Sequence, residues 1–293
     1  MNKMENKLAI LINYRDRPTE LSLLLQSLRT QIVKDFDIFI LDDCSGTPIT
    51  TYYFLNHLIT RLKLENHEVY VKHSGFPHGV SRARQNIVDW ALGTKNYEYL
   101  CRVDDDCILG PDYLDKLFGV IKEGYDLASG VTIPFTPTIK RNTKHLKGVI
   151  NRVILDENGN FLFNGDDCGM PYEDTQILPA HHFRSCALYK SKVHEKVKYY
   201  PTKLSMNGFR EEQIFSFKLL MNGFKIGVNT SAINYHLMTP SGGERNTMNM
   251  VPFNQQILEE FTKENKDKLI SLTSKKEDLE LLEYNKENNL LMR

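Results

Sequence analysis

Short apolar runs alternate with helix-like segments along the first part of the chain. The runs that predict buried strands are 8–12, 36–41, 68–71 and 97–103. The intervening segments with apolar residues at helical spacing are 16–28, 51–64 and 81–92. We expect Gly93 to end the third helix, as glycine commonly does. This alternation is typical of an α/β fold with a doubly wound, mixed but mostly parallel sheet and helices on both faces.

A second periodic block follows a less regular segment. Residues 158–173 are rich in Gly, Asn and Asp and predict a loop. The later elements predicted are a strand at 182–189, a helix from about 207 to 221, and strand character at 226–228 and 232–236. Beyond residue 240 a Gly-containing connector leads into an amphipathic tail, which we expect to be helical and to dock on the core or on a second subunit.

Composition narrows the class of protein. The 293 residues carry 37 Lys+Arg against 37 Asp+Glu, so no overall basic field would draw the chain to nucleic acid. Five cysteines without a CxxC pair disfavour a disulfide framework or a zinc knuckle and favour a reducing compartment. The N-terminal apolar run is too short for a signal peptide or a membrane span. We therefore expect a cytoplasmic protein, with peripheral membrane association left open.

One local stretch departs from the neutral balance. Residues 127–155 contain no acidic residue. The basic side chains of this stretch are Lys140, Arg141, Lys144, Lys147 and Arg152. It could be a solvated loop, or it could face an anionic polymer.

Acidic residues gather where two predicted strands end. Asp42 and Asp43 follow one strand, and the run Asp104, Asp105, Asp106 follows another. In open α/β sheets the chemistry lies at the carboxyl ends of the strands, so we expect these clusters to meet. Three adjacent carboxylates repel one another unless a cation or a donor network offsets their charge. The run predicts an Mg²⁺ or Mn²⁺ site at a diphosphate, with a solvated acidic turn as the alternative.

Other candidate residues allow both a structural and a functional interpretation. Glu211 and Glu212 begin a predicted helix, where acids suit the helix dipole but could also supply a general base. His236 ends a strand and is either a core histidine or a ligand that joins the aspartates. Arg84 lies near a helix start, where an anion could bind. Tyr14 could stack on a nucleobase or cover a sheet edge.

The order of these features resembles that of the inverting glycosyltransferases of family 2, which have the GT-A fold, over roughly residues 7–238. Cys44 stands where that family has glycine in an Asp-Asp-Gly-Ser turn. The segments that carry the resemblance are 8–14 with Arg17-Pro18, 42–45, 79–84, the DxD-like run 104–106 with 111–114, the pair 211–212 and His236.

The resemblance implies a nucleoside-diphosphate sugar donor, with a UDP-sugar favoured. Tyr14 would stack on the base, Asp43 would contact uracil and Asp105 would face the ribose. The full set of donor-binding residues that it implies is Tyr14, Arg15, Asp42, Asp43, Arg84, Asp104, Asp105 and Arg245.

The resemblance also implies the catalytic groups and the domain organisation. Asp106 and His236 would hold Mn²⁺ or Mg²⁺, and Glu212 would be the general base, with Glu211 as its rival. The implied organisation is a GT-A catalytic domain at 1–240, with a donor half at 1–110 and an acceptor half at 111–240, followed by a lid and helical tail at 241–293. A Gly-hinged lid of this kind would close over the donor.

Alternatives remain open from the sequence. The acceptor could be a glycan, a lipid-linked or other hydroxyl compound, or an anionic polymer such as modified nucleic acid at 127–155. A nucleotidyltransferase would also use strand-end aspartates and Mg²⁺, but the loop 13–17 lacks the glycines that bind phosphate in such enzymes. A non-catalytic binding protein is the third interpretation. The tail leaves homo-oligomer formation open.

Overall fold

A mixed sheet forms the centre of the computed structural model, which describes residues 7–135, 148–165, 172, 174–239, 242–243 and 249–288. Nine strands run in the order β3-β2-β1-β4-β10-β6-β11-β5, with β9 paired to β11. Their bounds are β1 Leu8–Tyr14, β2 Phe36–Asp42, β3 Val69–His73, β4 Tyr99–Asp104, β5 Cys107–Leu109, β6 Leu127–Pro134, β9 Ile177–Pro179, β10 Ala187–Lys190 and β11 Ile226–His236. A separate hairpin pairs β7 Arg152–Leu155 with β8 Phe161–Gly165.

The strand register brings the acidic clusters to one edge of the sheet. Strands β3, β2, β1 and β4 are parallel, with Tyr14 opposite Asp42 and Asn13 opposite Asp104. Strand β10 is antiparallel to β4 and β6, whereas β6 and β11 are parallel. The predicted mixed, mostly parallel α/β sheet is confirmed.

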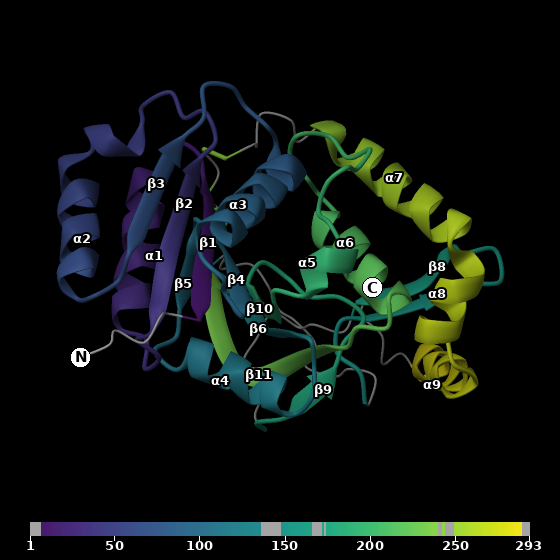
Figure 1. Ribbon diagram of the computed structural model, residues 1–293. Helices are drawn as coiled ribbons and strands as arrows, with labels where there is room; N and C mark the ends of the chain where they lie inside the picture. Colours follow the sequence, from purple (N-terminus) through teal and green to yellow (C-terminus); the bar gives the residue numbers. More distant parts are fainter. Residues whose placement is uncertain are drawn as a thin grey trace.

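Helices cover both faces of this sheet (Figure 1). One face packs on α1 Pro18–Arg29 and α2 Tyr53–Leu64, which bury leucines against β1 and β2, and on α4 Tyr113–Lys122, which lies against β6 and β11. The short 3₁₀ turn η1 Ile49–Thr51 precedes α2. The other face packs on α3 Val80–Thr94, α5 Val193–Lys196 and α6 Glu211–Met221.

The C-terminal segment is helical, as expected, and docks on the chain's own core. Its helices are α7 Val251–Glu264, α8 Lys266–Thr273 and α9 Lys276–Glu287. Leu258 and Leu269 are buried against Phe217 of α6 and Val153 of β7. These helices, yellow in Figure 1, lie on the side of the molecule away from α1 and α2. Among the described residues, no helix is both long and apolar enough to cross a membrane.

Several element predictions were wrong in detail. Gly93 does not end its helix, because α3 continues to Thr94. The segment 158–173, expected to be a loop, contains β8, which pairs with β7. The strand expected at 182–189 is confined to Ala187–Lys190. For β8, pairing with the distant β7 overrides the local composition.

The basic stretch is also not one surface. Its first part is β6, which is buried in the middle of the sheet. Arg152 is 1% exposed and ion-paired with Asp278 of α9, so it is not available to an anionic polymer. The remaining basic residues of the stretch, Lys140, Arg141, Lys144 and Lys147, lie outside the described residues.

Candidate functional site

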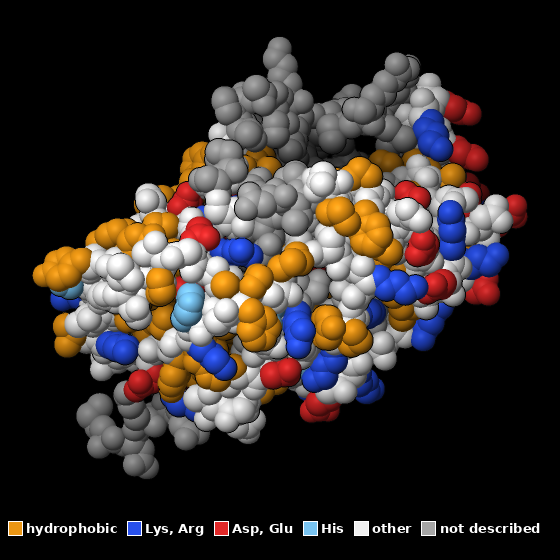
Figure 2. Space-filling model, turned by 90° about the horizontal axis from the view of Figure 1, so that it is seen from above, with side chains coloured by type: hydrophobic (Ala, Val, Ile, Leu, Met, Phe, Trp, Pro, Cys, Tyr) orange, Lys and Arg blue, Asp and Glu red, His pale blue; other side chains and the backbone are white. Residues whose placement is uncertain are grey.

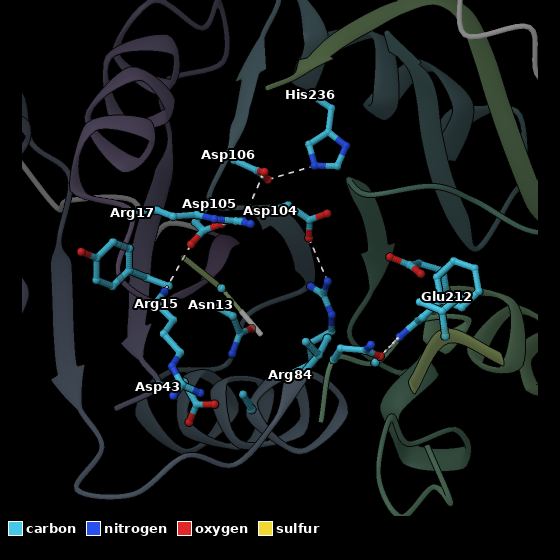
Figure 3. Close-up of a pocket in the computed structure, with 18 residues that line it drawn as sticks. Asn13, Arg15, Arg17, Asp43, Arg84, Asp104, Asp105, Asp106, Glu212 and His236 are labelled. Carbon is cyan, nitrogen blue, oxygen red and sulfur yellow. Dashed lines mark hydrogen bonds and ion pairs between the residues drawn. The ribbon is translucent and has the colours of Figure 1, made fainter. Parts of the chain in front are cut away.

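A pocket opens at the carboxyl ends of β1 and β4, facing the start of α6 (Figure 3). Its cavity volume is about 310 Å³, at the lower end of the range for ligand-binding clefts. Its lining residues come from the ends of β1, β4 and β11 and the loops after them, the turn after β2, the starts of α3, α6 and α7, and the loop before α6. They are Asn13, Tyr14, Arg15, Arg17, Asp43, Val80, Ala83, Arg84, Asp104, Asp105, Asp106, Asn207, Gly208, Phe209, Glu212, His236, Gly243 and Val251.

Arg17 offsets the charge of two of the three adjacent carboxylates. Its Nη1 lies 2.9 Å from Oδ1 of Asp105 and 3.2 Å from Oδ2 of Asp106. The backbone N–H of Arg15 also donates to Asp105, at 3.3 Å. Burial raises the pKa of Asp105; Arg17 opposes this rise and the Asp106 carboxylate adds to it. The loop after β1 therefore supplies the donors that let buried carboxylates lie side by side.

Asp106 and His236 form a pair that could hold a divalent cation. His236 Nε2 lies 3.0 Å from Asp106 Oδ1. Burial alone would raise the pKa of Asp106, but the hydrogen bond with His236 holds it below its usual range. Burial alone would lower the pKa of His236, but Asp106 raises it above its usual range. One carboxylate and one imidazole fit Mn²⁺ or Mg²⁺ when water or phosphate oxygens complete the coordination.

A buried charge network joins the DxD-like run to the acidic pair on α6. Arg84 Nη2 lies 2.8 Å from Asp104 Oδ1, and its Nε lies 3.0 Å from Glu211 Oε2. Arg102 of β4 contacts both glutamates, at 3.1 Å to Glu211 and 2.9 Å to Glu212. Burial alone would raise the pKa of Asp104, but Arg84 and Arg102 hold it below its usual range. The sequence analysis placed Arg84 at the nucleotide; its guanidinium is instead engaged by protein carboxylates.

The two glutamates differ in access to the pocket. The Glu211 side chain is 1% exposed and lies between Arg84 and Arg102. Burial raises its pKa, although both guanidinium groups oppose the rise. The Glu212 side chain is 27% exposed and lines the pocket, across from Arg15 and Arg17 in Figure 3. Glu212 can therefore reach a bound molecule, whereas Glu211 holds the arginines.

Asp42 and Asp43 shape the turn after β2. Asp42 is fully buried and accepts hydrogen bonds from the backbone N–H groups of Ser45 and Ile49, at 3.0 and 3.2 Å. It does not line the pocket. Asp43 does, but its carboxylate also accepts backbone N–H bonds from the start of α3, at His78 and Gly79.

Tyr14, the residue expected to stack on a nucleobase, is among those that line the pocket. Its side chain is 1% exposed and packs in the core beneath α1 and α2. Burial raises the pKa of its hydroxyl. Arg245 and most of the expected lid lie outside the described residues. Gly243 is described, and its N–H donates to the Arg15 carbonyl at 2.9 Å.

Two residues near the pocket, Gly79 and Cys44, have a positive φ. Gly79 has a φ of +77°, and a Cβ there would lie 2.9 Å from the Met206 Cα. This close approach lets Val80 N–H donate to the Met206 carbonyl at 2.8 Å, which joins α3 to the loop before α6. Cys44 has a φ of +63°, in the left-handed region that favours glycine.

The sequence analysis missed Arg102 and Cys107. Arg102 interrupts the apolar pattern of β4, and an arginine within a buried strand usually signals a paired charge. Cys107 lies close to Asp104 and His236, with one potential ligand atom from each within 4.8 Å of the others. Because Cys107 and His236 are distant in sequence, only the strand pairing reveals this cluster.

Comparison with known proteins identifies the family. The profile of glycosyl transferase family 2 matches residues 9–197, so the chain belongs to this family. The predicted family is therefore confirmed, and the nucleotidyltransferase alternative is not retained. A search of curated proteins found no match.

Solved structures with the same architecture confirm the GT-A fold. S. aureus TarS 1–349 in complex with UDP-GlcNAc has a TM-score of 0.57 and 15% identity, covering 82% of this chain and 61% of that one. The longer S. aureus TarS structure gives 0.54 and 16%, covering 80% and 37%. GalNAc-T7 with UDP, GalNAc and Mn²⁺ gives 0.57 and 13%, covering 80% and 44%. The chain thus spans less than two thirds of these proteins.

Proposed function

We propose that this protein transfers a sugar from a nucleoside-diphosphate sugar to a hydroxyl group, with inversion at the anomeric carbon. The observation that carries the proposal is one pocket that holds both the Asp106–His236 pair and the accessible Glu212 carboxylate in a family 2 chain. A UDP-sugar is the favoured donor, since TarS was solved with UDP-GlcNAc and GalNAc-T7 with UDP.

Glu212 acts as the general base in this proposal. Arg102 fixes its Oε1 at 2.9 Å, which orients the carboxylate toward the pocket. The carboxylate takes the proton of the acceptor hydroxyl while the acceptor oxygen bonds to the anomeric carbon. The electron pair of the breaking carbon–oxygen bond goes to the diphosphate, which leaves on the opposite face. Glu211 is a positioning residue that keeps Arg102 and Arg84 in place.

Asp106 and His236 would hold Mn²⁺ or Mg²⁺. When bound, the cation supplies positive charge beside the leaving diphosphate. Arg17 is the protein's own positive charge at this end of the pocket, fixed by Asp105 and Asp106. Preorganised charge of this kind favours the transition state because it needs no rearrangement during the reaction.

The two halves of the chain would divide donor from acceptor. Residues 1–110 supply the β1, β2 and β4 ends, and residues 111–240 supply Glu212 and the loop before it; His236, also from 111–240, is the one residue of that half proposed to act at the donor diphosphate. The acceptor is a hydroxyl of a glycan or a lipid-linked compound. On the face shown in Figure 2, the described Lys, Arg, Asp and Glu side chains are interspersed, so this described surface gives no support to a polyanionic acceptor.

A panel of sugar nucleotides tests the proposal. We expect one of them to raise the melting temperature of the purified protein, more so with Mn²⁺. Glu212→Gln should keep this shift but lower sugar transfer by about 10²- to 10⁴-fold, since it loses the base. Glu195→Gln, at an exposed position on α5 away from the pocket, is the matched control.

Two outcomes would count against this mechanism. If no sugar nucleotide binds or turns over, the proposed activity is wrong. If Glu212→Gln transfers sugar as fast as the wild type, Glu212 is not the base.

A further inference from the structure

Three different metal-binding side chains converge beneath the pocket. One potential ligand atom each from Asp104, Cys107 and His236 lies within 4.8 Å of the others. Asp104 ends β4, and Cys107 begins β5 after a turn of only Asp105 and Asp106. Strands β5 and β11 are antiparallel, and their register places His236 directly opposite Cys107. Directly opposed residues of an antiparallel pair share one face of the sheet, so the fold fixes this convergence.

The chemistry of this cluster differs from that of the Asp106–His236 pair. Sulfur is a soft ligand that Mg²⁺ rarely uses, whereas Zn²⁺, Co²⁺ and Cd²⁺ accept sulfur, nitrogen and oxygen together. Cys107 supplies this sulfur and is fully buried. The third ligand, Asp104, reaches Arg84 through Oδ1, and a carboxylate has a second oxygen to offer.

We propose that Asp104, Cys107 and His236 form a cation site selective for thiophilic divalent ions. His236 is shared with Asp106, whose Oδ1 lies 3.0 Å from its Nε2. An ion at the cluster therefore draws the imidazole away from the position proposed for Mn²⁺ or Mg²⁺. The site stands on these donor atoms alone; only its inhibitory effect on sugar transfer rests on the proposed function.

Metal binding at this site exchanges the Cys107 thiol proton for the ion. The sulfur–hydrogen bond of Cys107 breaks, a sulfur–metal bond forms, and the proton passes to solvent. His236 and Asp104 contribute one lone pair each. Three protein ligands leave a fourth position of a tetrahedral ion for water or a phosphate oxygen. An ion at this site would thus lie within reach of the pocket, because Asp104 and His236 both line it.

Cobalt titration of the chelator-treated protein tests the site without any sugar nucleotide. We expect Co²⁺ to give the thiolate-to-cobalt charge-transfer band and the visible bands of a four-coordinate ion. Cys107→Ser should abolish the charge-transfer band and weaken Co²⁺ binding at least about tenfold. The matched controls are Cys44→Ser, on the turn after β2, and Cys101→Ser, a buried thiol of β4; both should keep the band.

X-ray absorption on the cobalt-loaded wild type gives a readout that does not depend on a variant folding. We expect one sulfur neighbour at about 2.3 Å with nitrogen and oxygen neighbours. A cobalt ion without sulfur, or a charge-transfer band that survives in Cys107→Ser, would overturn the proposal. Sulfur-bound cobalt in a protein that binds no sugar nucleotide would uphold this site and reject only the proposed activity.

Discussion

Cys44 holds a backbone conformation that favours glycine. Its φ is +63°, and the turn around it is fixed by Asp42, which accepts from Ser45 N–H at 3.0 Å, and by the Ser45 hydroxyl, which accepts from Asp16 N–H at 2.9 Å. A left-handed residue with a Cβ costs roughly 1–2 kcal/mol. The surrounding hydrogen bonds hold the residue there despite this cost, beside the Asp43 carboxylate that lines the pocket.

We expect Cys44→Gly to raise the free energy of unfolding by roughly 0.5–1 kcal/mol. Relief of the left-handed strain exceeds the extra backbone entropy that glycine gives the unfolded chain. Urea unfolding of both proteins measures the difference. Cys44→Ala is the control, since alanine keeps the strain and should bring no gain. Equal stabilisation by alanine and glycine would show that strain is not the cause.

Helix α7 is tied to the loop before α6, which lines the pocket. Asn254 is fully buried; its Oδ1 accepts from Ser205 N–H at 2.8 Å and its Nδ2 donates to Asn207 Oδ1 at 2.6 Å. Asn207 lines the pocket and also accepts from Phe209 N–H at 3.0 Å. The C-terminal helices therefore support the loop that leads to Glu212, although they begin far along the chain.

Asn254→Ala should lower the free energy of unfolding by about 1–3 kcal/mol, because it leaves the Ser205 N–H without its acceptor in a buried place. Gln256→Ala, on the exposed side of the same helix, is the control and should change stability by less than about 0.5 kcal/mol. Urea unfolding compares the two. Similar changes from both variants would mean that the buried asparagine contacts do not determine the result.

The sequence predicts an element well when the residues that determine it are adjacent in the chain. The apolar runs of β1, β2 and β4 and the acids after them are contiguous, so the strand ends and their charge were predictable. Strand alternation also explains why the Tyr14 ring is buried: Leu8, Ile10, Ile12 and Tyr14 all face the same core cluster. Alternation applied through to the last residue of the strand would have placed the ring there.

The remaining features depend on pairing between distant segments. Strand β8 was hidden in a Gly- and Asn-rich segment because its partner β7, not its own propensity, makes it a strand. The proposal of Glu212 rather than Glu211 as the base depends on Arg84 of α3 and Arg102 of β4. These arginines enclose Glu211 and leave Glu212 partly exposed. Neither spacing nor composition carries this information.

Across the whole molecule, three buried histidines link stability to pH. Burial is the first cause that lowers the pKa of each, to about 4 for His181 and about 3 for His182 and His194. The neighbouring charges of Arg152 and Arg184 add to the effect on the first two. An unfolded histidine has a pKa of about 6.5. At these three positions the unfolded chain therefore binds more protons than the folded protein below that pH.

The sign of the effect follows from this difference. Above about pH 6.5 the contribution of these histidines to the free energy of unfolding is complete. It falls as the pH drops toward their pKa values in the folded protein, about 4 and about 3. Each lowers the free energy of unfolding by about 1.4 kcal/mol per pH unit within this window. Together these three histidines should remove roughly 4 kcal/mol by pH 5.5, a loss that the raised pKa values of Asp105 and His236 partly offset.

His194→Gln separates this effect from that of the carboxylates. His194 stacks on Phe215 and lies 3.2 Å from the Tyr189 hydroxyl, in the core under α6. Glutamine does not titrate, so the slope of unfolding free energy against pH between 6.5 and 4.5 should fall by about 1.4 kcal/mol per pH unit. His57→Gln, at an exposed position on α2, should keep the wild-type slope. Urea unfolding at a series of pH values measures both, and an unchanged slope in His194→Gln would show that this histidine is charged in the folded core.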